Sequence, residues 1–83
     1  MPEYNINIMW DNEAHVWVAT NDEIPIALES GSLDALIALV KLAVPELLEL
    51  NGLLPESKAI QLKFSAIREE RLDLRSTLTS RKT

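Results

Sequence analysis

Four carboxylates stand in two turn-rich segments of the N-terminal half and are the first candidates for chemistry. Asp11 and Glu13 lie in the first segment, and Asp22 and Glu23 lie in the second, adjacent one. Paired carboxylates can hold Mg²⁺, which a metal-dependent nuclease would use. Turn formers surround both pairs, however, and such positions are more typical of side chains in solvent. We therefore predict no metal site, and we assign the four carboxylates to an acidic surface that faces a partner protein.

The remaining polar residues offer no catalytic group. His15 is the only histidine, and no serine and aspartate are spaced to form a triad with it. General acid–base catalysis needs an oriented partner and a cleft, so we expect His15 to be a partly exposed strand residue. Gly31 and Gly52 are the only glycines, so there is no glycine-rich loop to hold phosphate. We predict that the protein is not an enzyme and has no cofactor.

Large apolar side chains suggest a protein interface. Trp10 and Trp17 stand on the two arms of a predicted hairpin and are expected to lie near each other. Both suit a core, but tryptophan is also enriched at interface hot spots, and Trp17 is the better interface candidate. Leu39 and Leu42 make the predicted helix more apolar than a lone helix needs. We predict an interface that contains Trp17, Leu39, Leu42 and Phe64.

The charge is distributed unevenly along the chain. Residues 1–57 carry ten acidic side chains and one lysine, a net charge of −9, whereas residues 58–83 carry three acidic and seven basic ones, a net charge of +4. A net charge of −5 does not favour DNA binding, which needs several cations on phosphates. The acidic part suits a basic partner. The basic tail is expected to be solvated, or paired with Glu69, Glu70 and Asp73. Its basic residues are Arg68, Arg71, Arg75, Arg81 and Lys82.

The composition also indicates where the protein works. Apolar residues make up 47% of the chain, enough for a core in a single small domain. There is no cysteine, so there are no disulfides. The N-terminal residues lack the pattern of a signal peptide, and charged residues and Pro45 interrupt the longest apolar run. We expect a cytoplasmic protein that does not contact membranes.

Three strands are expected to position the candidates in the first part of the chain. Apolar residues alternate over residues 3–10, and a β-branched and aromatic run covers residues 15–20. The second run is apolar on both faces, which predicts a central strand covered on both sides. A short, weakly patterned strand is expected at about residues 26–30. Turn residues separate these strands.

A helix should follow. Ser32 is a suitable N-cap, and apolar residues recur at helical spacing from Leu33 to Leu48. Pro45 should kink this helix, or else begin a second short helix. Asn51 and Gly52 provide the stop signal.

A fourth strand at residues 59–67 completes the order β-β-β-α-β. We therefore predict a two-layer α+β domain with an antiparallel-rich sheet and one helix packed on it. The domain should cover residues 1–68, with a basic extension at residues 69–83. Residues 68–74 can prolong the strand or form a helix, and residues 77–83 are expected to be a frayed end.

This order resembles the HicB-like antitoxin superfamily, and most closely its short, largely uncharacterised branch, over about residues 4–68. The residues that carry the resemblance are Trp10-Asp11, Glu13-Ala14, Val16-Trp17-Val18-Ala19, Ile24-Pro25, Ser32-Leu33-Asp34-Ala35-Leu36 and Val44-Pro45-Glu46-Leu47-Leu48-Glu49-Leu50-Asn51. The strand block and the Pro-Glu-Leu-Leu run are moderately specific together, whereas either one alone is weak.

The resemblance implies a fold related to a reduced RNase H layout without its nuclease activity, a bacterial origin, and self-association. It also implies an antitoxin-like domain that masks a small, basic, RNA-cleaving toxin. Ile26 departs from the glycine that often follows the proline in this family. After the fourth strand only about sixteen residues remain, too few for the C-terminal DNA-binding module of full-length antitoxins. The alternatives are a metal-dependent, nuclease-related enzyme and a small-molecule-binding domain with a pocket between helix and sheet.

Overall fold

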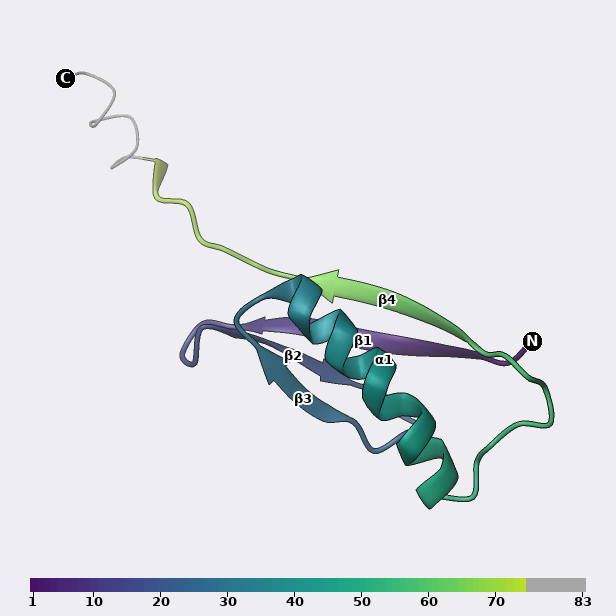
Figure 1. Cartoon of the computed structure of the whole chain (residues 1–83). Helices are drawn as coiled ribbons and strands as arrows, with labels where there is room; N and C mark the ends of the chain where they lie inside the picture. The colour runs from purple at the N-terminus through teal and green to yellow at the C-terminus, as the bar shows by residue number, and fades with distance from the viewer. Residues whose placement is uncertain (75–83) are drawn as a thin grey trace.

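A computed structural model describes residues 1–74 and contains the predicted order β-β-β-α-β (Figure 1). The chain forms a four-stranded mixed sheet with one helix packed on it, as predicted. The elements are β1 (Glu3–Asp11), β2 (Val16–Thr20), β3 (Ala27–Ser30), α1 (Leu33–Leu50) and β4 (Gln61–Ile67).

The strands lie side by side in the order β3-β2-β1-β4. β2 pairs antiparallel with both β1 and β3, so these three strands form a meander. The chain then crosses the sheet through α1, and β4 returns parallel to β1. β3 and β4 are therefore the two edges of the sheet.

The core lies between the sheet and α1. Alternate residues of β1 point toward the helix, so Ile6 and Ile8 are fully buried. Leu36, Val40, Val44 and Leu48 supply the buried stripe of α1 at a spacing of four residues, which keeps them on one face. Ala19 on β2 and the loop residues Ile24 and Ile26 complete the core.

The prediction that β2 is covered on both faces was wrong. β2 is an interior strand, but within the described residues α1 covers only one face of the sheet (Figure 1). Val18 therefore lies on the uncovered face and is only partly buried, whereas Ala19 is fully buried beneath the helix.

Both helix ends form as the sequence indicates. The Ser32 hydroxyl accepts a hydrogen bond from the backbone N–H of Ala35 at 3.3 Å, which satisfies one of the free donors of the first turn. At the other end, Gly52 has φ +66°, and its N–H donates to the Glu49 carbonyl. The N–H of Leu53 donates back to the carbonyl of Leu48 at 2.8 Å. This pair of bonds is the Schellman motif, which favours glycine at the left-handed position.

Pro45 lies inside α1 and does not begin a second helix, so that alternative was wrong. The helix continues from Leu33 to Leu50 across it. Because proline has no backbone N–H, the carbonyl of Lys41 has no partner one turn later. The helix tolerates this loss because its buried stripe, which includes Val44 and Leu48 on either side of Pro45, packs in the core.

Two details of the strands differ from the predictions. His15 does not begin β2 but ends the hairpin loop, with φ +55°. β4 ends at Ile67, and residues 68–73 have no regular secondary structure, so neither predicted conformation was found over them. The predicted frayed end at residues 77–83 lies outside the described residues. The boundary at residue 68 stays a prediction.

Candidate protein-interaction surfaces

An apolar strip crosses the sheet face that α1 leaves uncovered. Met9 on β1 lies directly opposite Val18 on β2, and Met9 also lies opposite Ile67 on β4. Met9 is 60% exposed and Ile67 is 55% exposed, so this strip is open to solvent. Val18 lies opposite the exposed Glu29 on β3, which places a carboxylate at the end of the strip.

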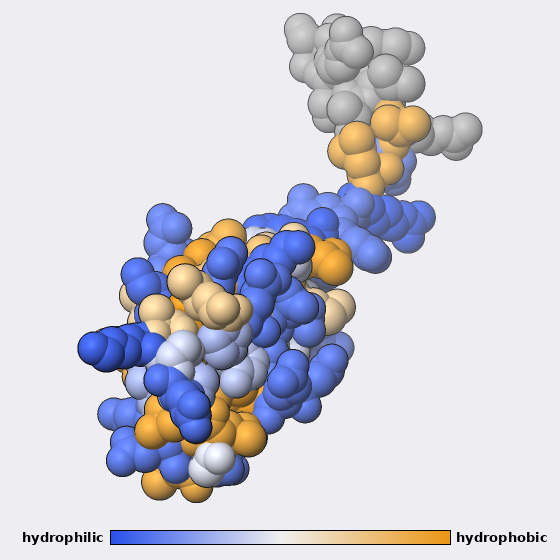
Figure 2. Space-filling model, turned by 90° about the vertical axis from the view of Figure 1, so that its right-hand side faces the viewer, coloured by the Kyte–Doolittle hydropathy of each residue, from blue (hydrophilic) through white to orange (hydrophobic). Residues whose placement is uncertain are grey.

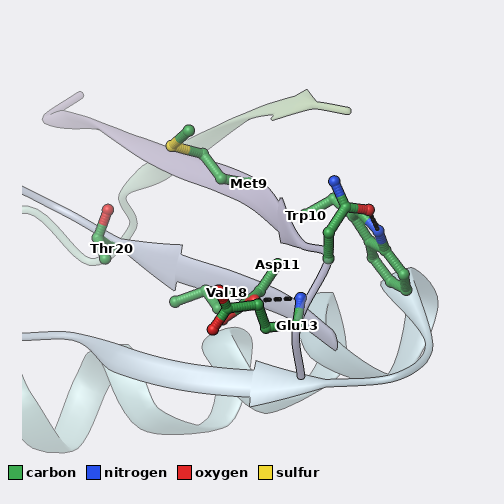
Figure 3. A pocket seen from close by; sticks show the side chains of 7 residues that line it. Met9, Trp10, Asp11, Glu13, Val18 and Thr20 are labelled. Carbon is green, nitrogen blue, oxygen red and sulfur yellow. Dashed lines mark hydrogen bonds between the residues drawn. The ribbon is translucent and has the colours of Figure 1, made fainter. Parts of the chain in front are cut away.

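The β1–β2 hairpin loop places Asp11 and Glu13 beside this strip. Met9, Val18 and Thr20 line a shallow hollow with the two acidic residues (Figure 3). Asp11 has a structural role, because its Oδ1 accepts the backbone N–H groups of Glu13 at 2.9 Å and Ala14 at 3.1 Å. Such a turn fixes the loop and leaves the Glu13 carboxylate in solvent.

The second acidic pair lies elsewhere. Asp22 and Glu23 follow β2, whereas Asp11 and Glu13 precede it, so the two pairs stand at opposite ends of this strand. The two turn segments are consecutive along the chain, but β2 separates them, so the four carboxylates do not form one cluster. Asn21 organises the second loop, because its Oδ1 accepts the N–H groups of Glu23 and Ile24, each at 2.7 Å. The exposed Asp22 and Glu23 form a separate acidic surface.

Among residues 1–74, no three acidic or histidine side chains gather as a metal site would require. The two acidic pairs that suggested Mg²⁺ are separated by the length of β2. No helix in this part of the chain is both long and apolar enough to cross a bilayer.

Trp10 and Trp17 meet on the helix side of the sheet, at the hairpin end. They lie opposite each other in the β1–β2 ladder, and their ring centroids are 5.3 Å apart in an edge-to-face arrangement. Their predicted proximity is therefore confirmed. Trp17 is half-buried and packs against the core, so only part of it is available to a partner.

Arg68 covers this pair of tryptophans. Its guanidinium lies 4.1 Å from the centroid of the Trp10 ring and 5.9 Å from that of Trp17. Arg68 also forms an ion pair with Glu70 at 2.7 Å, which confirms the predicted pairing for this one basic residue. The predictions for Arg75, Arg81 and Lys82 lie outside the described residues.

A groove runs between α1 and β4. One wall of the groove is formed by the partly buried residues Ile60, Leu62 and Phe64. Its helix wall is formed by Ile37, Lys41, Val44 and Pro45, and the groove holds about 470 Å³ of space. The groove exists because α1 packs closely against β2 and β3 and leaves the β4 side of the sheet less covered. Phe64, a predicted interface residue, thus lies at a partly open site.

The other two predicted interface residues lie on α1. Leu42 is 73% exposed and Leu39 is 42% exposed, so both point away from the buried stripe of the helix. Trp17, Phe64 and the two leucines therefore do not form a single surface. They lie at the hairpin end, in the groove and on the outer side of the helix.

Sequence reasoning did not assign Met9 and Val18 to a surface, and it missed the contact of Arg68 with the tryptophans. The strict alternation of β1 places Met9 on the face opposite Ile6 and Ile8, so its exposure followed from the pattern once one face was known to be open. The contact of Arg68 depends on the parallel pairing of β4 with β1, which no local pattern reveals.

Comparison with known proteins gives a family and a structural neighbour. Residues 3–76 match a family described as a domain of unknown function, DUF1902. A solved structure, that of the hypothetical protein TTHA1013 from the extremely thermophilic bacterium Thermus thermophilus, is similar with a TM-score of 0.72 and 38% sequence identity. The similarity covers 84% of this chain and 99% of that one. No curated protein matches the chain.

Proposed function

The chain belongs to the DUF1902 family, and we propose that it is a HicB-like interaction domain that binds a small basic protein and has no catalytic activity of its own. The residues of β2 and the Pro-Glu-Leu-Leu run of α1 support the HicB-like assignment. The excess of acidic side chains in residues 1–57 supports a basic partner. The class of partner that the resemblance favours is a basic, RNA-cleaving toxin in the cytoplasm.

The observation that carries this proposal is the apolar strip with carboxylates around it. Met9 and Val18 are paired on the open face of the sheet, and Glu13 and Glu29 lie at its margins. Protein interfaces commonly combine an apolar centre with a polar rim. Carboxylates at the rim would attract a basic partner and raise its association rate. DNA is not proposed as a partner, because the strip carries the wrong charge.

The test compares the carboxylates beside the strip with the acidic pair at the other end of β2. The reading frames beside the gene are first searched for one that encodes a short basic protein. That protein is purified, and its affinity for this chain is measured by calorimetry. Glu13→Lys and Glu29→Lys should each weaken binding by about tenfold and slow association. Each substitution replaces a carboxylate that attracts the basic partner by a cation that repels it. Asp22→Lys and Glu23→Lys are the matched controls and should change affinity far less.

Two outcomes oppose this proposal. If the controls weaken binding as much as Glu13→Lys, the effect comes from net charge and not from the strip. If the neighbouring frame encodes no basic protein, or its product does not bind, the antitoxin-like function is wrong. A genuine interface should also lose affinity when Met9→Asp places a charge in the apolar strip, with the circular dichroism spectrum unchanged.

A further inference from the structure

β4 presents unpaired backbone groups at the edge of the sheet. The N–H of Gln61 donates to the Pro2 carbonyl at 2.8 Å, so the main-chain groups of Gln61 point toward β1. These groups alternate in direction along a strand, so those of Leu62, Phe64 and Ala66 point away from β1. No described element lies on that side of β4 (Figure 1). A row of free donors and acceptors is therefore available to another strand.

The two edge strands differ in the number of residues that they offer for pairing. β3 has four residues, whereas β4 has seven, so β4 is the longer template for pairing. Proteins that must stay monomeric shorten their edge strands or place prolines, bulges or charged residues, especially lysines, in them. β4 contains neither a proline nor an interruption of its ladder with β1, and Lys63 is its only charged residue.

We propose that a second copy of this chain docks on β4, the two β4 strands pairing antiparallel about a twofold axis at Phe64. Phe64 is the middle residue of Gln61–Ile67, so this register uses the whole strand. It places Leu62 opposite Ala66 of the partner subunit, and it opposes Lys63 with Ser65 of the partner subunit. Two lysines therefore do not meet across the interface, and every outward-pointing main-chain group gains a partner. The inference goes beyond the proposed function, because it concerns self-association and does not need the basic partner.

The groove beside β4 supports a second copy as the occupant. Phe64 and Leu62 line it and remain only partly buried in the single chain. In the proposed pair the two Phe64 side chains lie next to each other on the helix side of a continuous sheet. The grooves of the two subunits then face each other, and their apolar walls leave water together.

The segment after β4 gives a second, independent reason. Residues 68–74 extend away from the domain as an arm, and its Leu72 and Leu74 are 68% and 65% exposed (Figure 1). In an antiparallel pair the arm leaves β4 where the partner's β4 begins, which places it beside the loop before that strand. This loop carries the exposed Leu53 and Leu54.

Charges of both signs lie on the two segments. The arm contains Glu69 and Glu70 with Arg68 and Arg71, and the loop before β4 contains Glu56 and Lys58, so the exposed leucines carry the argument for this contact. Figure 2 looks at the end of the molecule that holds this loop, and apolar surface is visible there and on the arm. The exposed leucines of the arm and of the loop would therefore be covered by each other in the pair.

The first test removes one backbone N–H that points away from β1. It leaves the hydrogen bonds between β4 and β1 intact. Ala66 is exposed and its N–H points away from β1, so Ala66→Pro removes a hydrogen bond of the proposed pair but none of the single chain. Sedimentation equilibrium should show a wild-type dimer and a dissociation constant raised about tenfold or more in Ala66→Pro. The control Ala66→Ser keeps the N–H and should remain dimeric.

A disulfide test checks the register and does not depend on the proline variant being folded. The chain has no cysteine, so engineered thiols have no background. Residues directly opposite at a non-hydrogen-bonded position are about 4.5 Å apart at Cα, a distance that a disulfide spans. A mixture of Lys63→Cys and Ser65→Cys chains should therefore oxidise mainly to the mixed dimer, whereas either chain alone should crosslink poorly.

The outcomes separate this inference from the proposed function. A wild-type chain that is monomeric at micromolar concentration contradicts self-association in every form. A dimer that persists in Ala66→Pro, without preferential Lys63→Cys to Ser65→Cys crosslinking, contradicts docking through β4 alone. Self-association through another surface, such as Leu39 and Leu42 of α1, would then remain.

Discussion

The guanidinium of Arg68 lies 4.1 Å from the centroid of the Trp10 ring and links the chain after β4 to the β1–β2 hairpin. Trp10 is held in turn by its Nε1, which donates to the Asn12 side chain at 2.8 Å, and by the ring of Trp17. Because β4 is parallel to β1, the residue after β4 reaches the same end of the sheet as the hairpin loop. This contact sets where the arm of residues 68–74 begins.

Replacing Arg68 should loosen that link. Arg68→Ala removes a cation–π contact at a partly exposed site, so we expect a loss of about 0.5–1 kcal/mol in the free energy of unfolding. The tryptophan emission should also shift to longer wavelength, because water reaches the Trp10 ring. Arg71→Ala, on the same arm, is the control. Identical emission spectra and urea midpoints for the two variants would contradict a role for the stack.

The buried stripe of α1 should dominate stability. Leu36 is fully buried, so Leu36→Ala should lower the free energy of unfolding by about 2–5 kcal/mol through lost packing and a cavity. Leu42 is 73% exposed, and Leu42→Ala should change this free energy by less than about 0.5 kcal/mol. Urea titrations followed by tryptophan fluorescence measure both. A large effect at Leu42 would show that the outer side of α1 is covered, as in an oligomer that uses this surface.

The two glycines should respond differently to the same substitution. Gly52 has φ +66°, a conformation that costs other residues about 1 kcal/mol or more, so Gly52→Ala should destabilise the protein by about that amount. Gly31→Ala places its new Cβ 3.9 Å from the His15 carbonyl, an ordinary contact, and should have the smaller effect. Thermal unfolding by circular dichroism compares them. Equal losses would mean that helix termination at Gly52 does not depend on its left-handed conformation.

Removing the proline from α1 should strengthen the helix. Pro45→Ala restores a backbone N–H that can donate to the Lys41 carbonyl, and alanine is preferred to proline inside a helix by about 3 kcal/mol. Pro45 also lines the groove beside β4, so part of this gain is offset by lost packing. We expect a net increase of roughly 1 kcal/mol in the free energy of unfolding. Glu46→Ala, at the next position, is the control, and a decrease on Pro45→Ala would show that groove packing outweighs the backbone term.

Local patterns were sufficient to predict the elements. The alternation of Ile6 and Ile8 indicated β1, and the spacing of Leu36, Val40 and Val44 indicated α1 with the correct buried face. Ser32 and Gly52 marked the two ends of that helix. These signals are local, because each depends on backbone geometry within a few residues.

The candidate surfaces were predicted less well. The acidic side chains were found by residue type, and the strand predicted between them already separates Asp11 from Asp22. Phe64 and Leu42 were predicted to belong to one interface, yet they lie on different surfaces. Residue type indicates what a surface can bind, whereas grouping residues into one surface requires the strand order.

The sequence by itself determined the secondary structure, the buried stripe of α1 and the acidic character of residues 1–57, because these follow from side-chain chemistry and short-range geometry. The tertiary structure alone decided that β4 pairs parallel with β1 at an edge, that one face of the sheet stays open, and that Arg68 meets Trp10. Strand order is set by contacts between residues far apart in the chain, and no local pattern encodes them.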